Sequence, residues 1–196
     1  MTDKTIRNSK DDALTQAEIK ILLAGCHDDL DELIVRLAAF RGLRISEIAH
    51  MRRSWIDFDK GTIKIPEKQN CSCRACRDTG GRWSPKSRAG ARLLRITPEL
   101  EPYLSRYFTS NEAIGRTRDT LYKRLQKIWE RSPLVEKDRV YPHCLRASYC
   151  TDAAYKGMSS GSLKYICGWA DLGSAENYIM SDAHRAMDEE ASLTSE

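Results

Sequence analysis

Six side chains in this sequence belong to types that phosphate and proton chemistry use, and each stands in a distinctive short stretch. Arginine presents a planar fork of N–H donors to phosphate oxygens, lysine and histidine can carry a proton, and a tyrosine hydroxyl can act as a nucleophile. Taken singly, each also has an ordinary structural explanation, such as a surface arginine or a core aromatic ring. The six are Arg44 in RGLRISE, Lys86 in WSPKSRAGARLLRI, His143 and Arg146 in YPHCLRAS, Trp169 in CGWAD, and Tyr178 in ENYI.

Several common catalytic motifs are missing from the sequence. It contains no GxxxxGK[ST] phosphate loop, no GxGxxG fingerprint and no HExxH. Nucleotide hydrolysis and common hydrolase chemistry are therefore disfavoured. No apolar run approaches the roughly 18 to 20 residues that span a bilayer, and the opening MTDKTIRNSKDD lacks the apolar segment of a secretory signal. We expect a cytoplasmic protein that does not act at a membrane.

The order of these stretches resembles the tyrosine recombinases, the phage-integrase family of site-specific DNA recombinases. The resemblance spans roughly residues 13–181, and five family motifs occur in the family's order with its usual separations. One such match is weak evidence, whereas five in order are strong. The matches are LTQAE (14–18) for the LTxxE helix start, GLRISE (42–47) for the first box, Lys86 for the lysine in a turn of a small β-sheet, HCLR (143–146) for the second box, and GW (168–169) followed by Tyr178.

The resemblance implies a reaction that breaks a DNA phosphodiester without a metal or nucleotide cofactor. In it, Arg44 and Arg146 stabilise charge on the non-bridging phosphate oxygens. Tyr178 attacks to form a 3′-phosphotyrosyl bond, which a 5′ hydroxyl later reseals without ATP. Lys86 is then the general acid for the leaving 5′ oxygen, and His143 assists proton movement and holds the phosphate.

The sequence departs from the family pattern at two positions. Ala147 follows the second-box arginine, where the family often has histidine, and Trp169 replaces the commoner histidine. Trp169 therefore cannot do acid–base chemistry and serves as an indole N–H donor or as a packing buttress. We expect Glu47 to be structural and to orient Arg44 or the neighbouring backbone. The CSCRAC insertion before the lysine also resembles integrases of archaea and their viruses.

Basic residues are concentrated in the middle of the chain. Between Glu67 and Arg131 there are fifteen Lys or Arg against seven Asp or Glu, within a net charge of +4. Such a basic surface suits a polyanion. The resemblance implies that this polyanion is double-stranded DNA at a specific site. It also implies that the protein binds the site as a homotetramer, with host accessory proteins. A type IB topoisomerase and a non-catalytic DNA-binding protein on the same fold remain alternatives. Six residues are predicted to contact backbone phosphates: Arg82, Arg88, Arg92, Lys123, Arg124 and Lys127.

Three cysteines form a C-x-C-x-x-C cluster that could bind a metal. Cys71, Cys73 and Cys76 supply three thiols, whereas structural zinc normally takes four ligands. A structural zinc, a loop of free thiols and a disulfide all remain open, and zinc would stiffen the loop that presents Lys86. Three residues elsewhere could complete the site if the fold brings one of them near: Cys26, His27 and His50.

The elements that position these residues are predicted to form a mainly α fold with a small antiparallel β-sheet. A capping box at Thr15 and Glu18 begins the first helix, and apolar residues at helical spacing predict a second from Leu30 to Gly42. Further elements are a β-hairpin over 55–65, a third strand over 91–96, a helix that begins at Thr97-Pro98, a helix through 121–128, and helices over most of 144–180.

Three parts are expected along the chain. Residues 1–12 are predicted to be a tail or linker stub, residues 13–181 the catalytic domain, and residues 182–196 an acidic C-terminal tail. The acidic tail either docks on a neighbouring subunit or is a disordered terminus. Integrases usually carry a helical core-binding domain first, so this sequence is either a shortened chain or a naturally minimal recombinase.

Overall fold

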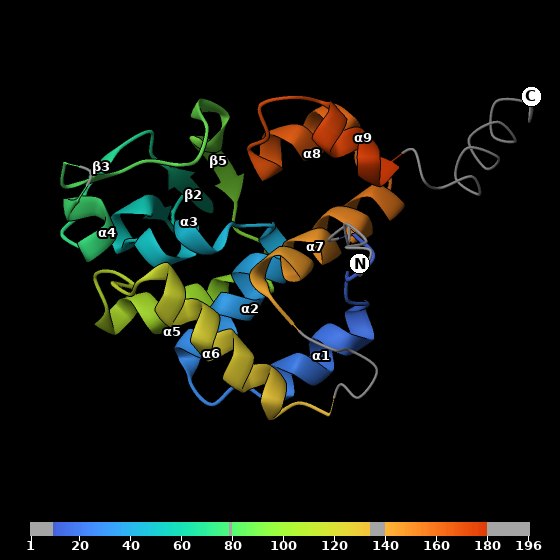
Figure 1. Ribbon diagram of the computed structural model, residues 1–196, viewed down its shortest axis with the longest axis horizontal. Coiled ribbons are helices and arrows are strands. Elements are labelled where there is room, and N and C mark those ends of the chain that lie inside the picture. The colour runs from blue at the N-terminus through green and yellow to red at the C-terminus, as the bar shows by residue number, and fades with distance from the viewer. Residues whose placement is uncertain (1–9, 79, 134–139, 180–196) are drawn as a thin grey trace, which may run out of the picture.

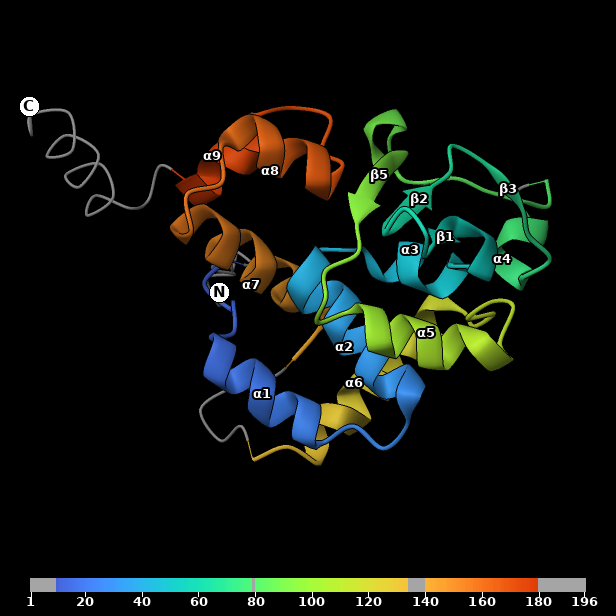
Figure 2. The same cartoon turned by 180° about the vertical axis from the view of Figure 1, so that it is seen from behind.

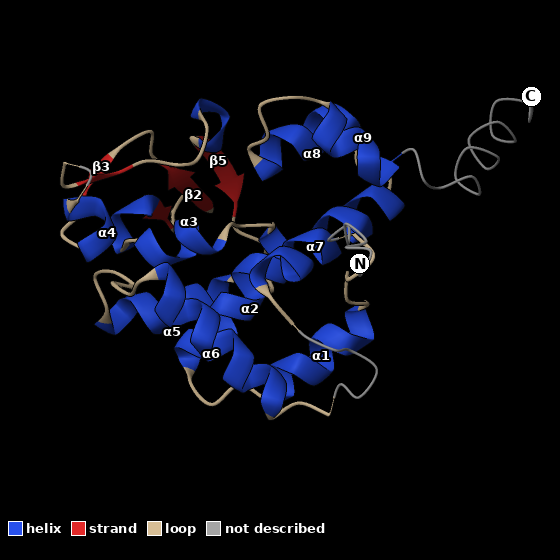
Figure 3. Cartoon of the chain, viewed as in Figure 1, coloured by secondary structure: helices blue, strands red, loops and turns tan. Residues whose placement is uncertain are grey.

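A computed structural model of the chain describes residues 10–78, 80–133 and 140–179. Helices predominate, and the strands gather at one end of the molecule beside the third and fourth helices (Figure 1, Figure 3). The helices are α1 (Gln16–Ala24), α2 (Asp29–Arg41), α3 (Ile45–His50), α4 (Arg74–Arg77), α5 (Glu101–Ser110), α6 (Arg118–Glu130), α7 (Pro142–Tyr155), α8 (Ser160–Cys167) and α9 (Gly173–Ile179). The strands are β1 (Ile56–Asp57), β2 (Thr62–Ile65), β3 (Gln69–Asn70), β4 (Arg82–Trp83) and β5 (Arg92–Arg95), with short 3-10 turns at Arg53–Trp55 and Arg88–Gly90.

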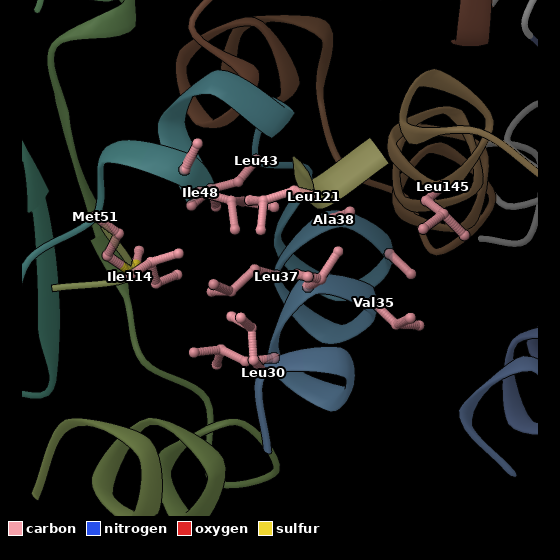
Figure 4. Close-up of a cluster of buried hydrophobic side chains, with 14 of the residues drawn as sticks. Leu30, Val35, Leu37, Ala38, Leu43, Ile48, Met51, Ile114, Leu121 and Leu145 are labelled. Carbon is pink, nitrogen blue, oxygen red and sulfur yellow. The ribbon is translucent and has the colours of Figure 1, made fainter. Parts of the chain in front are cut away.

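Helix α2 forms the centre of the helical part and packs against α1, α5, α6 and α7. The predicted helix is confirmed, but it is buried on more than one face, because Leu33, Ile34 and Val35 are all fully buried. Side chains of α2 point outward in several directions, and Leu145 of α7 lies to one side of them (Figure 4). Burial of each large aliphatic side chain stabilises the fold by roughly 1.5–3 kcal/mol, so α2 anchors the segments that carry the candidate site.

Two predicted helix ends are confirmed. The Thr15 hydroxyl accepts a hydrogen bond from the Glu18 N–H at 3.2 Å, and the Glu18 carboxylate accepts one from the Thr15 N–H at 2.6 Å, which completes the capping box of α1. Helix α2 ends at Gly42 in the left-handed conformation, with φ of 63°.

The helix predicted to begin at Thr97-Pro98 begins later. Leu100 donates its N–H to the Thr97 carbonyl at 2.9 Å, which makes a separate turn, and α5 follows from Glu101 with Pro102 in its first turn. Proline lacks an N–H and is tolerated in the first turn of a helix, and Pro102 occupies that position in α5. Pro102 therefore takes the first-turn position that was predicted for Pro98.

The predicted hairpin and third strand are confirmed as a three-stranded antiparallel sheet in the order β1-β2-β5. Ile63 of β2 lies opposite Ile56 on one side and Leu94 on the other, and all three side chains are buried. The intervening Lys64 and Leu93 are exposed, which is the period-2 alternation expected of a sheet with one solvent face. A second sheet, in which β3 pairs with β4, was not predicted, because two-residue strands are too short for alternation to reveal.

The helices predicted over most of 144–180 are confirmed as α7, α8 and α9, which pack on one another. Helix α8 also contacts β5, so the C-terminal helices meet the sheet although they are far apart in sequence (Figure 2). Among the described residues, no helix is both long enough and apolar enough to cross a bilayer.

The last residues of the predicted N-terminal tail contact the helical body. Lys10 donates through Nζ to the Asn177 carbonyl at 2.9 Å, and the Asp12 carboxylate accepts a hydrogen bond from the Tyr141 hydroxyl. Residues 1–9 and the predicted acidic tail, 182–196, lie outside the described residues.

Candidate active site

One cavity, of about 600 Å³, brings together side chains from α3, α7, α9 and the loops between β4 and β5 and between α8 and α9. The residues it joins are separated by up to 134 positions in the sequence. It also includes Arg118 at the start of α6, which sequence reasoning missed because no motif marks it. All six residues singled out in the sequence line this cavity: Arg44, Lys86, His143, Arg146, Trp169 and Tyr178.

Arg44 occupies the N-cap of α3 and is held on two sides. Its Nη1 donates to the Glu47 carboxylate at 3.0 Å, and its Nη2 donates to the Gly168 carbonyl at 2.9 Å. Glu47 also accepts from the Arg44 backbone N–H at 2.9 Å, so this carboxylate orients Arg44 as expected. Burial lowers the pKa of Arg44 from its ordinary value, and the nearby positive charge of Arg146 lowers it further. An anion in the cavity would relieve that repulsion.

Arg146 is more deeply buried, with 5% of its surface exposed. It lies in the first turns of α7 and donates to the carbonyls of Gly42 and Cys167, which end α2 and α8 respectively. The C-terminal end of a helix carries partial negative charge, which favours a guanidinium there. Gly42 has a left-handed backbone, and a Cβ on it would lie 2.6 Å from the Tyr149 ring, so both conformation and space require glycine.

A buried ion pair joins Arg92 to Glu47, the carboxylate that also holds Arg44. Arg92 donates to the two Glu47 oxygens at 3.0 and 3.1 Å, and both side chains are fully buried. Burial alone would raise the pKa of Glu47, but its hydrogen bonds and ion pairs with Arg92 and Arg44 outweigh burial and lower it. Glu47 therefore stays ionised at neutral pH.

The prediction that Arg92 contacts a DNA phosphate is wrong. Only 4% of its surface is exposed, and besides Glu47 it donates to the Ile166 carbonyl at 2.6 Å and the Gly90 carbonyl at 2.7 Å. In β5 its side chain lies on the same face as buried Leu94. Buried and exposed residues alternate along the strand, which places Arg92 inside although its charge led to the opposite expectation.

Trp169 and Tyr178 lie against each other on the wall of the cavity. Their rings are stacked, with centroids 5.7 Å apart and planes 12° from parallel. The Arg146 guanidinium carbon lies 5.3 Å from the centre of the Trp169 ring, within the range of a cation–π contact. Trp169 thus contacts both the tyrosine and one arginine, which is the arrangement of a packing buttress.

His143 and Lys86 complete the lining of the cavity. His143, in the first turn of α7, is exposed, whereas the neighbouring Arg146 is buried. The pKa of His143 is lowered, first because the surrounding groups partly remove water from its ring and then because of the charges of Arg146, Arg44 and Lys86. His143 is therefore neutral at neutral pH and can accept a proton. Lys86 is exposed on the loop between β4 and β5.

The other predicted phosphate contacts divide into two groups. Arg82, Arg88, Lys123 and Lys127 are exposed and could reach a ligand. Arg124, by contrast, donates to Asp31 at 2.8 Å and is also paired with Asp28. Its charge is balanced within the protein, and it does not fit the prediction of a free phosphate contact.

The cysteine cluster is brought together with one of the three residues considered as a fourth ligand. Cys71, Cys73 and Cys76 lie beside His50, and the four potential ligand atoms are all within 4.8 Å of one another. Cys26 and His27 lie elsewhere, between α1 and α2. All seven cysteines fall within the described residues, and none of them is in a disulfide.

The sequence profile of the phage integrase family matches residues 12–185. That range covers most of the chain and contains every one of the six cavity residues. The chain belongs to the phage integrase family.

This phage integrase family chain is similar to curated proteins from archaea and bacteria. It is 23% identical over 177 residues to tyrosine recombinase XerA of Saccharolobus solfataricus, covering 88% of this chain and 53% of the relative. It is 25% identical over 206 residues to the transposase of transposon Tn916 from Enterococcus faecalis, covering 89% of this chain and 48% of the relative. The chain thus spans about half the length of these relatives. The archaeal relative agrees with the archaeal resemblance noted in the sequence.

Two solved structures confirm the fold expected for the family. The Tn1549 transposon integrase in complex with transposon right end DNA has a TM-score of 0.76 and 21% identity, covering 100% of this chain and 69% of that one. The catalytic domain of bacteriophage HP1 integrase has a TM-score of 0.58 and 17% identity, covering 93% of this chain and 94% of that one. The mainly α architecture with small antiparallel sheets is therefore that of a tyrosine recombinase catalytic domain.

Proposed function

We propose that this chain is the catalytic part of a site-specific DNA recombinase that cuts and rejoins strands through a 3′-phosphotyrosyl intermediate. The observation that carries the proposal is the single cavity lined by Arg44, Arg146, His143, Lys86 and Tyr178. A phosphodiester carries one negative charge, and this cavity concentrates positive charge around one tyrosine. Family membership and the similarity to named recombinases support the same reaction.

The two arginines stabilise the charge that develops on the non-bridging oxygens. A guanidinium has five N–H donors, and the hydrogen bonds of Arg44 to Glu47 and Gly168 use two of them. Because the protein already holds each guanidinium in place, little reorganisation is needed when phosphate binds. Comparable preorganised donors are worth roughly 100-fold to 1000-fold in rate each.

Tyr178 is the proposed nucleophile. Its phenolic oxygen attacks phosphorus, the bond from phosphorus to the 5′ oxygen breaks, and a 3′-phosphotyrosyl ester forms. Lys86 gives a proton to the leaving 5′ oxygen, and neutral His143 accepts the proton that the Tyr178 phenol loses and holds the phosphate. The ester keeps the energy of the broken bond, so attack by a 5′ hydroxyl from the exchanging strand restores the phosphodiester and releases the phenol. Neither ATP nor a metal takes a step in this reaction.

Double-stranded DNA at a specific recombination site is the proposed substrate, acted on in the cytoplasm by a homotetramer with host accessory proteins. The exposed side chains of Arg82, Arg88, Lys123 and Lys127 support backbone contacts, which give affinity and salt dependence and carry no direct sequence information. In this proposal zinc has a structural role.

The proposal is tested by covalent capture on DNA. The protein is incubated with a pool of duplexes of randomised sequence, each nicked so that cleavage releases a short fragment that diffuses away and prevents resealing. DNA that stays attached after denaturation in detergent is recovered and sequenced. We expect attached DNA to be enriched in one site. Failure to attach any DNA would contradict the proposal, and the non-catalytic alternative would then fit better.

Plasmid relaxation separates the proposal from the topoisomerase alternative. A supercoiled plasmid without the captured site should remain supercoiled when incubated with the protein. Efficient relaxation of that plasmid by the chain would favour a type IB topoisomerase.

A further inference from the structure

His50 and three thiols converge at the C-terminal end of α3, away from the cavity that holds Tyr178. The Nε2 atom of His50 lies 3.6 Å from the Cys73 sulfur and 3.5 Å from the Cys76 sulfur. In a tetrahedral zinc site, with bonds of about 2.3 Å to sulfur and 2.0–2.1 Å to nitrogen, neighbouring sulfur and nitrogen atoms lie about 3.5–3.6 Å apart. The observed distances match two edges of such a tetrahedron.

The His50 ring is oriented for metal binding by a second contact. Its Nδ1 lies 2.7 Å from the Ser46 carbonyl. A carbonyl only accepts hydrogen bonds, so Nδ1 carries the proton and the lone pair of Nε2 is directed at the thiols. The ring also stacks on Trp83, with centroids 5.1 Å apart and planes 17° from parallel. Metal-binding histidines typically have such an outer hydrogen bond, which fixes tautomer and orientation.

We propose that His50, Cys71, Cys73 and Cys76 bind a structural zinc ion. One imidazole and three thiolates make a closed set of four soft and borderline ligands, which suits zinc and leaves no position open for a reacting water. The thiols lose their protons when the metal binds. Cys26 and His27, the other ligands that the sequence offered, have no part in the site.

The segment that carries the thiols contains little regular secondary structure, although Cys76 and Trp83 are buried in the core. Strands β3 and β4 have two residues each and α4 has four, joined by backbone bonds between Cys71 and Gly81 at 2.9 Å and between Gly81 and Cys76 at 2.7 Å. An isolated two-stranded hairpin is marginally stable in water. A metal that ties this segment to α3 would add to the stabilisation that the burial of Cys76 and Trp83 provides.

The zinc site would connect two parts of the reaction cavity. Helix α3 begins after Arg44 and ends at His50, and β4 ends at Trp83, three positions before Lys86. Fixing one segment on the other therefore limits where the Lys86 loop can lie relative to Arg44. This consequence rests on the proposed function, whereas the metal site itself does not.

Metal content tests the site without DNA. The full chain is purified without chelators, and its zinc is measured by elemental analysis. We expect one zinc per chain in the wild type, loss of that zinc in Cys73→Ser and in His50→Ala, and its retention in the matched controls Cys26→Ser and His27→Ala. A wild type without zinc that also takes up none when zinc is added would overturn the proposal. Retention of zinc by both ligand variants would overturn it as well.

Replacing the zinc with cobalt gives a second measurement, which uses only the wild-type protein and so requires no variant to fold. Cobalt(II) in the wild type should show the strong visible absorption of a tetrahedral ion together with thiolate charge-transfer bands. The weak absorption of a six-coordinate ion bound to oxygen and nitrogen would contradict the assignment.

The link to Lys86 is tested by removing the zinc with a chelator and adding it back. We expect the rate of covalent attachment to DNA to fall at least several-fold on removal and to recover on addition. An unchanged rate in zinc-free protein would refute the link. If the zinc-loaded protein attaches no DNA at all, the proposed function fails while the measured metal content still decides the site.

Discussion

Arg44 donates a hydrogen bond from Nη2 to the carbonyl of Gly168 at 2.9 Å, across 124 positions of sequence. Arg146 makes the corresponding contact in the other direction, to the Gly42 carbonyl. Each arginine is thus held by a left-handed glycine at the end of a helix. Gly42 belongs to the same motif as Arg44, and Gly168 follows Cys167, whose carbonyl also accepts a hydrogen bond from Arg146. These hydrogen bonds hold the GLRISE and HCLR motifs in fixed positions relative to each other. They explain how the cavity keeps the guanidinium groups of Arg44 and Arg146 close together.

Replacing Gly168 with alanine should weaken both the fold and the cavity. The residue has φ of 62°, and a Cβ would lie 2.8 Å from Arg92 Nη1 and 3.0 Å from the Ala89 carbonyl oxygen. The left-handed backbone alone costs about 1–2 kcal/mol for a non-glycine residue. The matched control is Gly61→Ala, because Gly61 has φ of 61° and open space around its Cβ position. In chemical denaturation we expect a larger loss of stability for Gly168→Ala than for Gly61→Ala, and reduced DNA attachment for Gly168→Ala only. Equal losses of stability and of DNA attachment in Gly168→Ala and Gly61→Ala would show that the contacts of Gly168 with Arg92 and Ala89 are unimportant.

Alanine substitutions of Arg92 and Arg88 should affect different properties. Arg92→Ala should lower the free energy of unfolding, and Arg88→Ala should weaken DNA binding. Loss of Arg92 leaves the buried Glu47 charge without its bidentate partner, and removing one member of a buried pair costs roughly 3–5 kcal/mol in unfolding free energy. Arg88 is exposed, so Arg88→Ala should leave stability unchanged and weaken DNA binding. Loss of one phosphate contact reduces the slope of log affinity against log salt by about 0.9. A lower slope in folded Arg92→Ala would contradict its assignment as a structural residue.

Glu47→Gln should make the free energy of unfolding less dependent on pH in the acid range. The folded pKa of Glu47 lies below its ordinary value of 4.5, so the ionised carboxylate stabilises the native state fully above that value. This contribution is lost as pH falls through the folded pKa, because the unfolded chain binds the proton more readily. We therefore expect the variant to be less stable than the wild type by roughly 3–5 kcal/mol at neutral pH, with a gap that narrows in acid.

The control for Glu47→Gln is another acid-to-amide change at the surface. Asp57 pairs with Lys60 at 3.0 Å, and both side chains are solvent-exposed. Asp57→Asn should leave stability nearly unchanged at neutral pH. A gap between wild type and Glu47→Gln that stays constant down to strongly acid pH would refute the proposed pair.

Lys86→Ala should be rescued by a better leaving group. If Lys86 protonates the 5′ oxygen, its loss should slow cleavage by about 100-fold to 10,000-fold on normal DNA. A substrate with sulfur in place of the bridging 5′ oxygen expels a thiolate, which needs no protonation because a thiol pKa is about 8.5. Cleavage rates measured in single turnover should then be similar for Lys86→Ala and wild type, whereas Arg44→Ala stays slow on both substrates. A Lys86→Ala defect of equal size on both substrates would rule out the general-acid role.

Much of the fold and of the cavity could be predicted from local patterns. The capping box at Thr15, the apolar spacing of α2 and the alternation from Trp55 to Ile65 each depend on neighbouring residues, so the sequence shows them directly. The six cavity residues could be found because each belongs to a motif whose order resembles a family. Arg118 belongs to no motif, and only the packing of α6 against α3 brings it to the cavity.

Most errors came from contacts between distant segments. Charge suggested that Arg92 faces DNA, but its partner Glu47 is 45 positions away, and composition does not reveal that pairing. His50 was one of three candidates as fourth ligand, and the choice depends on where α3 ends relative to the thiols. The start of α5, by contrast, was a local error, because the helix begins at Glu101 and not at the predicted Thr97-Pro98.

The most direct test of the account is covalent attachment to the captured DNA site by Tyr178→Phe. Tyr178 stacks on Trp169 in the cavity, whereas Tyr155 is 77% exposed at the end of α7, so Tyr155→Phe removes one hydroxyl as a matched control. The account predicts that wild type and Tyr155→Phe form the detergent-resistant adduct at similar rates and that Tyr178→Phe forms none while still binding the DNA. Adduct formation by Tyr178→Phe at the wild-type rate would contradict the assignment of the nucleophile and with it the proposed reaction.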